Sequence, residues 1–213
     1  MKSIGRGGRA GLFALSVIAT ASSTYASPLA GDQPNLASIP LFAQFASDGP
    51  LLHGYKAPVQ MTGSLHKFFF SIHFRREGEI SYVRPDSLDF SLDAVPQQYS
   101  SMLAQLGTPR TWPYLYEFEC VKNVGADGTA MYELRGVPKS PSSDVDHLVV
   151  RMSDGSGPID AQWTLKDGWV VHSTIHMESV GNFLVPKEEN SDITGHGFNI
   201  HSDMTYGNYV LSS

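Results

Sequence analysis

The feature that most restricts the fold of this chain is a regular alternation of apolar and polar side chains. Successive side chains of a strand point to opposite faces, so each alternating run predicts a strand with one apolar and one polar side. Such strands are typical of a large antiparallel sheet that packs on one face only. The apolar positions are Phe68, Phe70, Ile72 and Phe74; Leu88, Phe90 and Leu92; Tyr114, Tyr116 and Phe118; Leu148, Val150 and Met152; and Ile159, Ala161, Trp163 and Leu165.

Turn signals separate these runs at a spacing of about ten residues, which predicts about nine to eleven strands. Asp-Gly pairs supply the positive φ that tight hairpins need. We therefore expect a mainly β fold, either a half-open antiparallel barrel or a strongly curved sheet, with one or two short helices as a lid or plug. The turn signals are Asp127-Gly128, Asp154-Gly155 and Asp167-Gly168, with a further hairpin expected at Arg76-Glu77-Gly78-Glu79.

One segment has helical spacing instead. Residues 96–106 begin with Pro96, end before Gly107 and place four apolar residues on one side, which predicts an amphipathic helix across a sheet face. It would serve either as a core plug or as a lid over a ligand cavity. The four apolar residues, which are the expected lid residues, are Tyr99, Met102, Leu103 and Leu106.

The first 26 residues have the pattern of a secretory signal peptide, which predicts an exported protein, periplasmic or secreted. A basic start with Lys2, Arg6 and Arg9 precedes an apolar run. This run is shorter than the about 20 residues of a membrane span, so we do not expect an integral membrane protein. We expect residues 27–58 to form an irregular segment with a short helix, and residues 59–213 to form a single β-rich domain.

The charge and the cysteine content exclude some classes of function. Without the first 26 residues the chain has 12 Lys and Arg against 21 Asp and Glu, a net charge of −9. An acidic protein repels phosphate backbones, so we expect no nucleic-acid partner. Cys120 is the single cysteine and shares the apolar face of Tyr116 and Phe118, so we interpret it as a small buried hydrophobic residue.

Two stretches together resemble the LolA/LolB-like superfamily of periplasmic lipoprotein carriers. Residues 78–90 (GEISYVRPDSLDF) are similar to its early hairpin, in which a glycine, a tyrosine and a proline stand at fixed offsets. The second stretch runs from Tyr132 through residues 148–150 and Asp167-Gly168-Trp169 to Pro186, and is similar to the later strands. The resemblance covers about residues 60–211. It implies a half-open antiparallel barrel with a concave apolar face, a helical lid, no catalytic residues and an acyl chain or other lipid as ligand.

The residues themselves show no catalytic motif, and we expect neither enzymatic activity nor a cofactor. A metal-dependent extracytoplasmic enzyme is the alternative. His172 and His176 have the spacing of a helical metal pair, but their neighbours alternate as in a strand, where the two residues would lie about 13 Å apart. His196 and His201 could lie next to them on a neighbouring strand and form a metal site together with them.

The predicted inner face carries more aromatic residues than one short helix can cover, and the excess would line a pocket. We therefore predict an exported soluble protein that binds a lipid or another apolar small molecule in the concave face of the sheet. A membrane-associated donor or acceptor protein would be a further partner. The alternative without a ligand is a structural or sensing interaction module. The expected ligand-binding residues are Phe68, Phe70, Ile72, Tyr82, Phe90, Tyr116, Phe118, Leu134, Val150 and Trp163.

Overall fold

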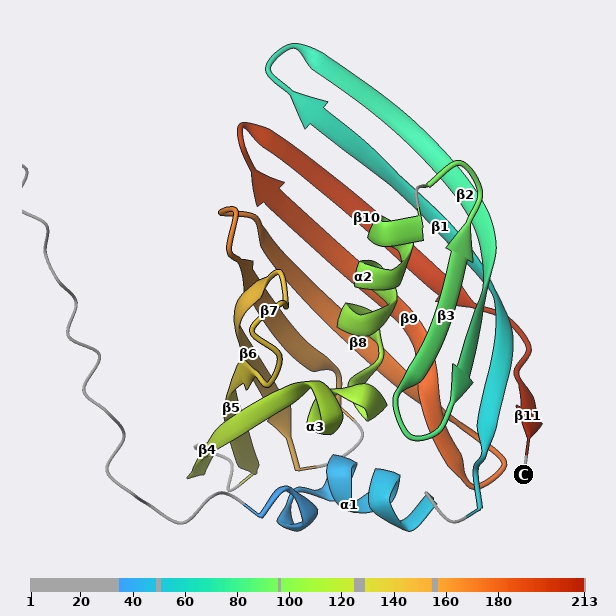
Figure 1. The fold of residues 1–213 in the computed structure, drawn as a ribbon, viewed down its shortest axis with the longest axis vertical. Helices are drawn as coiled ribbons and strands as arrows, with labels where there is room; N and C mark the ends of the chain where they lie inside the picture. Colours follow the sequence, from blue (N-terminus) through green and yellow to red (C-terminus); the bar gives the residue numbers. More distant parts are fainter. Residues whose placement is uncertain (1–34, 49–50, 96, 125–128, 155–156, 213) are drawn as a thin grey trace, which may run out of the picture. The chain divides into compact units, whose positions relative to one another are not determined.

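A computed structural model describes residues 35–48, 51–95, 97–124, 129–154 and 157–212 (Figure 1). The predicted signal peptide, the turn signal Asp127-Gly128 and Gly155 lie outside these residues. Within them, no helix is both long enough and apolar enough to cross a membrane.

The described residues are mainly β, and the predicted fold class is confirmed by one antiparallel sheet of eleven strands that does not close (Figure 1). The strands are β1 (Gly54–Lys67), β2 (Phe70–Val83), β3 (Ser87–Leu92), β4 (Tyr116–Val124), β5 (Ala130–Pro138), β6 (Val145–Ser153), β7 (Ile159–Leu165), β8 (Val170–Val180), β9 (Phe183–Gly195), β10 (Phe198–Tyr206) and β11 (Val210–Ser212). The helices are η1 (Leu36–Ser38), α1 (Pro40–Asp48), α2 (Gln97–Gly107), η2 (Pro109–Thr111) and α3 (Trp112–Leu115).

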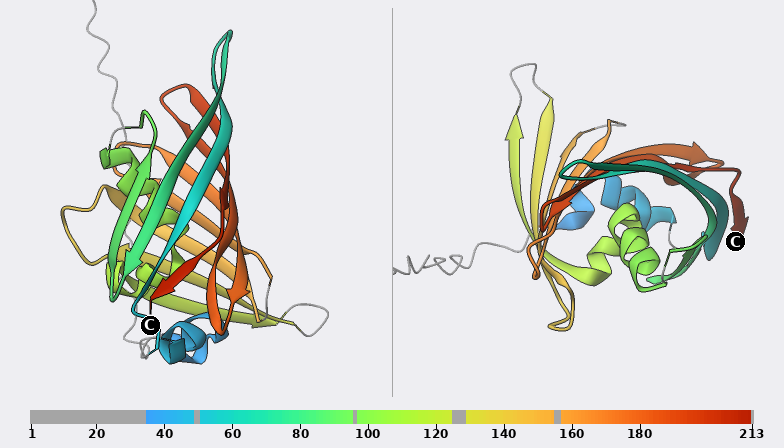
Figure 2. Two further views of the ribbon diagram at one scale, coloured as in Figure 1. Left: turned by 90° about the vertical axis from the view of Figure 1, so that its right-hand side faces the viewer. Right: turned by 90° about the horizontal axis from the view of Figure 1, so that it is seen from above.

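The order of the strands puts two sequence neighbours at opposite edges of the sheet. The order is β3-β2-β1-β10-β9-β8-β7-β6-β5-β4, with β11 beside β1. The connection from β3 to β4, residues 93–115, therefore passes from one edge to the other. Figure 2 shows that it does so across the concave face, and that α2 lies inside the curve of the sheet.

The concave face carries two groups of buried side chains. The first core lies on β4 to β8 and includes residues of α1 and α3, and the second core lies mainly on β1, β2, β3 and β10. Helix α2 contacts both, because Met102 and Leu106 pack on the first core and Leu103 and Ala104 on the second. The predicted helix at residues 96–106 is confirmed, and it is wedged between the two cores.

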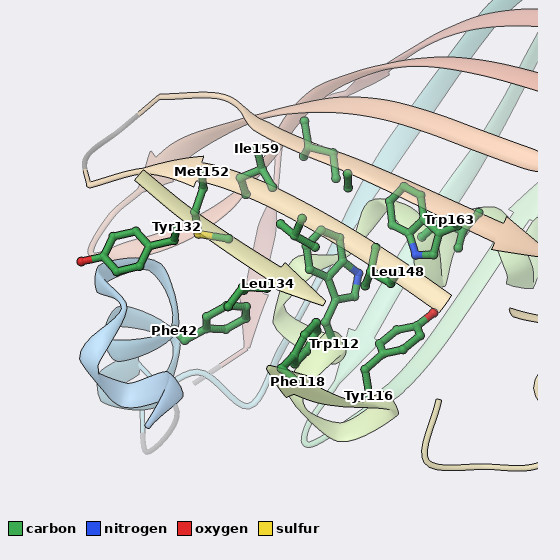
Figure 3. Close-up of a cluster of buried hydrophobic side chains, with 14 of the residues drawn as sticks. Phe42, Trp112, Tyr116, Phe118, Tyr132, Leu134, Leu148, Met152, Ile159 and Trp163 are labelled. Carbon is green, nitrogen blue, oxygen red and sulfur yellow. The ribbon is translucent and has the colours of Figure 1, made fainter. Parts of the chain in front are cut away.

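Two tryptophans hold the crossing connection against the sheet. Trp112 of α3 packs edge-to-face on Trp163 of β7, with ring centroids 5.7 Å apart (Figure 3). Both side chains are fully buried. The Trp112 indole also donates a hydrogen bond of 3.0 Å to the carbonyl oxygen of Gln105, which ties α3 to the end of α2.

A buried ion pair joins the same connection to the N-terminal helix. Arg110 of η2 donates to Asp48 at the end of α1 over 2.9 Å, and the two side chains are only 6% and 7% exposed. The guanidinium also donates to the carbonyl oxygen of Leu184 on β9 and lies over the Phe45 ring. Since α1 begins at Pro40, the proline occupies the first turn, where its missing N–H costs no hydrogen bond.

The hairpin predicted at Arg76-Glu77-Gly78-Glu79 is wrong. Strand β2 continues through these residues to Val83, and the turn lies instead at Phe68-Phe69, between the paired residues Lys67 and Phe70. Gly78 is in the strand because β3 approaches closely there, and a Cβ would collide with the carbonyl group of Ser91. Tyr114, expected on a strand, lies in α3, and β1 begins at Gly54, before the expected boundary at residue 59.

The buried ion pair predicts a large effect on stability. Asp48→Ala leaves the Arg110 guanidinium buried without its counter-charge, and we expect the free energy of unfolding to fall by about 3 to 5 kcal/mol. Urea unfolding followed by tryptophan fluorescence measures this change. The control is Glu77→Ala, which breaks the exposed pair with Arg75 and should cost less than about 1 kcal/mol. Equal costs for the two variants would contradict the role of the buried pair.

Candidate functional site

An apolar cavity of about 940 Å³ remains on the concave face between the two cores. Its walls come from β1, β2, β7, β8, β9 and β10, from the start of the crossing connection and from α2. The lining residues are Met61, Leu65, Ile72, Phe74, Arg76, Ala94, Val95, Met102, Leu103, Asp144, Leu165, Lys166, Asp167, Trp169, Val171, Ile193 and Ile200.

The floor of the cavity is a row of aliphatic side chains that are directly paired across five neighbouring strands. Residues paired in an antiparallel sheet project to the same face, so the row forms a continuous apolar strip. In the order β2 to β8, the row consists of Ile72, Leu65, Ile200, Ile193 and Val171. It continues into the first core through Trp163 and Leu148, where other side chains cover it. The cavity thus lies over the part of this row that leads into the first core, of which Val171 is already a buried member.

Helix α2 forms one side of the cavity. Met102 and Leu103, two of the expected lid residues, are half-buried and line it. Leu106 is fully buried in the first core and serves as the anchor of the helix. The side chain of the fourth expected lid residue, Tyr99, lies outside the described part of the structure.

The structure places the expected ligand-binding residues in three environments. Ile72 lines the cavity. Phe68 and Phe70 lie at the tip of the β1–β2 hairpin, where they are 85% and 70% exposed. The remaining residues share the apolar face with the cavity but are buried within the two cores, and Figure 3 shows Tyr116, Phe118, Leu134 and Trp163 in the first of these. These residues are Tyr82, Phe90, Tyr116, Phe118, Leu134, Val150 and Trp163.

Several lining residues were missed by the sequence reasoning, among them Ile193 and Ile200. Serines at 191 and 202 and Glu189 occupy the same face, so the apolar alternation of β9 and β10 is interrupted. Trp169 was assigned to the stretch that resembles the later strands of the family, and not to the ligand site. Its indole lies at the edge of the cavity, stacked on Phe198 with centroids 6.1 Å apart. The signal that would have found these residues is strand pairing, which sequence alone does not give.

A row of polar side chains lies directly beside the apolar row. Ser202, Ser191 and Ser173 are paired across β10, β9 and β8, and all three are buried. The hydroxyl groups of Ser173 and Ser191 donate to Oε1 of Glu189 over 2.9 and 2.8 Å. The apolar strip therefore ends at a buried hydrogen-bonded carboxyl group.

The end of helix α2 covers this carboxyl group. Gly107 lies against Oε2 of Glu189 and the Tyr206 hydroxyl, and a Cβ at this position would collide with the carboxyl. Burial raises the pKa of the Glu189 carboxyl, while the hydrogen bonds from Ser191 and Ser173 oppose this change. A raised pKa favours the neutral acid, which fits a carboxyl group that forms no salt bridge within the described part of the chain.

The hairpin tip is the most exposed apolar surface of the described residues. Phe68 and Phe69 form a two-residue turn and are 85% and 103% exposed. Phe68 has a φ of 52°, a left-handed conformation that favours glycine or asparagine. Lys67, next to the turn, lies over the Phe198 ring at 3.8 Å, which connects the hairpin to the rim around Trp169.

The four histidines of the alternative metal site are not brought together. His172 lies on β8, confirmed as a strand, and pairs with Asp160 at 2.8 Å on the polar face. His201 lies two strands away, and the hydrogen bond to Asp192 raises its pKa. His176 lies farther along β8, and His196 packs on Trp169 in the β9–β10 turn. No group of three His, Cys, Asp or Glu in the described ranges is arranged to hold a metal ion.

The single cysteine lies where the alternation placed it. Cys120 on β4 is half-buried and packs on the first core. Burial raises the pKa of its thiol, which lowers the fraction present as the nucleophilic thiolate. The thiol is therefore suited to packing and not to nucleophilic chemistry.

Comparison with known proteins identifies the fold. No protein-family model and no curated protein matches the sequence. Among solved structures, a domain described as an outer membrane lipoprotein-sorting protein from Vibrio parahaemolyticus has a TM-score of 0.51 at 10% identity, covering 81% of this chain and 91% of that one. A LolA superfamily protein from Nitrosomonas europaea has a TM-score of 0.51 at 10% identity, covering 76% and 88%. A DUF1329 family protein from Desulfovibrio piger has a TM-score of 0.50 at 11% identity, covering 81% of this chain and 93% of that one.

The predicted LolA-like fold is therefore confirmed. At these identities the similarity establishes the fold alone. The function has to be argued from the cavity and the surfaces around it.

The buried carboxyl predicts an unusual pH dependence. The folded state holds the Glu189 proton more tightly than the unfolded chain, whose carboxyl titrates near 4.5. The free energy of unfolding should therefore fall as the pH rises above this value, the reverse of a salt-bridged carboxylate. Glu189→Gln cannot titrate, so in this variant the free energy of unfolding should fall less as the pH rises. Urea unfolding at a series of pH values tests this, with Glu188→Gln on the polar face of β9 as the control. Superimposable pH profiles for wild type and Glu189→Gln would contradict the assignment.

Proposed function

We propose that this chain is an exported binding protein, periplasmic or secreted, that holds a lipid or another apolar ligand in the concave face of its sheet. The observation that carries the proposal is the cavity of about 940 Å³ between two packed cores. Its size lies within the range of small-molecule sites, about 300 to 1,000 Å³. Its walls are mostly aliphatic and aromatic, as such sites usually are.

Binding would be driven by burial of apolar surface. An acyl chain of about twelve carbons would gain roughly 8 to 10 kcal/mol before the costs of association, at about 0.8 kcal/mol for each buried CH₂ group. The chain would lie along the aliphatic row, from Ile72 on β2 toward Val171 on β8. No bond is made or broken in this mechanism, so the proposed protein is a carrier and not an enzyme.

Helix α2 would act as the lid of the cavity. Leu106 is anchored in the first core, while Met102 and Leu103 are half-buried and contribute flexible side chains to the wall. Methionine adapts its shape to irregular apolar partners, which suits a wall that meets different ligands. Ligand entry would then require rearrangement of the lid side chains while the sheet stays fixed.

The hairpin tip is a suitable contact with a membrane that donates or accepts the ligand. Phe68 and Phe69 project from the turn of the same hairpin whose residues Leu65 and Ile72 line the cavity. Aromatic rings partition well into the interface between lipid and water. We propose that the partner is a bilayer surface, on which the tip would place the cavity near the acyl chains.

Native mass spectrometry of the purified exported protein, before and after organic extraction, tests the carrier function. We expect an additional mass of a few hundred daltons that extraction removes and that fragments as a lipid, in the size range of a small-molecule ligand. A bare mass would favour the interaction module, which needs no ligand. A mass excess that matches a metal ion would favour the enzyme alternative instead.

A pair of neighbouring substitutions locates the ligand. Ile200→Asp places a charge on the cavity floor, and we expect it to weaken binding of a neutral fluorescent lipid probe by at least about tenfold, since burial of a charge against an acyl chain is costly. Asn199→Asp adds the same charge one residue away, at an exposed position on the other face of β10, and should leave binding unchanged. Thermal unfolding would confirm that both variants fold. Equal retention of the probe by both variants would contradict the cavity assignment.

The hairpin tip predicts membrane binding that depends on its rings. Phe69→Ser should lower partitioning onto phospholipid vesicles by about tenfold, because a phenyl ring gains about 1.5 to 3 kcal/mol on burial. Phe68→Gly should do the same while relieving the left-handed backbone at this position. Vesicle co-sedimentation measures both effects, and Val210→Ser, an exposed apolar residue on β11, is the control. Undiminished sedimentation of the two tip variants would exclude this contact.

A further inference from the structure

One arginine in the wall of the cavity has no acidic partner among the residues that the structure describes. Arg76 of β2 is paired with Met61 of β1, and both residues line the cavity. Met61 is buried in the second core, so Arg76 is on the concave face, and its neighbour Arg75 is on the convex face, paired with Glu77. Arg76 forms no ion pair among the described residues. Its Nη1 donates one hydrogen bond of 2.8 Å to the carbonyl oxygen of Arg75.

An unpaired guanidinium beside an apolar wall needs a compensating partner. A charge that is half-removed from water costs free energy unless an opposite charge or hydrogen bonds replace the water. The guanidinium presents five N–H donors in a planar fork that fits carboxylate and phosphate oxygens. Only one hydrogen bond of Arg76 is made within the described residues, so most of the fork is available to a ligand.

The other charged groups at the cavity favour one orientation of such a ligand. Lys166 donates its Nζ hydrogen bond to the carbonyl oxygen of Pro141 at 3.0 Å. Asp144 and Asp167 border the cavity from the loops next to β6 and β7, across the sheet from β2. These two carboxylates would repel an anion from their side, whereas Arg76 would attract it. The aliphatic row lies between the two sides, where an apolar tail would be buried.

We infer that the cavity binds an amphiphile with a single anionic oxygen head group, a carboxylate or a phosphate monoester, and that Arg76 holds this head group. The inference rests on the proposed carrier function and names the class of ligand for the same site. Arg76 is a specificity-determining residue, because it distinguishes an acid from the corresponding neutral alcohol. The apolar tail contributes affinity that is common to both.

Competition for a neutral probe tests the inference. Decanoate, decyl phosphate and decanol would each displace N-phenyl-1-naphthylamine from the purified protein. We expect both anions to bind more tightly than decanol, and Arg76→Gln to weaken the anions by about 10- to 100-fold, the range of charged hydrogen bonds. Decanol should change by less than about twofold, within the usual effect of a surface substitution. The control is Arg75→Gln, which removes a neighbouring arginine from the convex face of β2 and should change no affinity.

The outcomes separate this inference from the proposed function. If decanol and the anions bind equally, or if Arg76→Gln leaves the anions unaffected, the inference is overturned and the carrier function stands. If none of the three ligands displaces the probe, the carrier function itself fails. A preference between decanoate and decyl phosphate identifies a fatty acid or a phosphate ester as the source of the head group. If Arg76→Gln does not fold, the test uses the wild-type protein alone. The inference then requires that decanoate binds more tightly than decylammonium, and equal binding of the two overturns it.

Discussion

The architecture depends on how one connection crosses the sheet. Residues 93–115 leave the edge strand β3 and reach the opposite edge strand β4, so they must pass over the concave face. The Trp112–Trp163 contact and the buried pair between Arg110 and Asp48 fix the far end of this connection. Helix α2, at its near end, is held between the two cores and covers only part of the face. The cavity is the part of the face that this single connection cannot cover.

Different elements of the chain cover the two cores. In the first core, α1 and the crossing connection cover β4 to β8, and side chains such as Trp163 are fully buried. In the second core, α2 supplies the main cover over β1 to β3, and it ends at Gly107 against the buried Glu189 carboxyl. On the side of the hairpin tip, beyond the first turns of α2 (Figure 1), Leu65 is half-buried and Ile72 is 50% exposed. Exposure of the apolar face therefore rises from the cores toward the hairpin tip, where Phe68 and Phe69 are 85% and 103% exposed.

Alternation in the sequence was sufficient to predict the sheet, its single apolar face and the helix at residues 96–106. It could not distinguish cavity from core, because Trp163 and Ile72 follow the same pattern and differ only in what lies above them. That cover depends on pairing between distant segments, such as Leu65 with Ile200. The hairpin at Phe68-Phe69 was missed for a local reason, since two phenylalanines replace the glycine that usually marks such a turn. Gly78, taken as a turn residue, is explained by the close approach of β3.

Two glycines in the sheet control the volume of the cavity. A Cβ at Gly63 would lie 2.7 Å from the Phe74 ring, and a Cβ at Gly195 would lie 2.6 Å from the Trp169 ring. Both rings line the cavity, and each packs against its glycine. A side chain at either position would collide with the ring, and at Gly63 also with the carbonyl oxygen of His201. The sequence thus combines large aromatic residues, which protect the sheet from water, with glycines that keep those residues out of the volume a ligand would occupy.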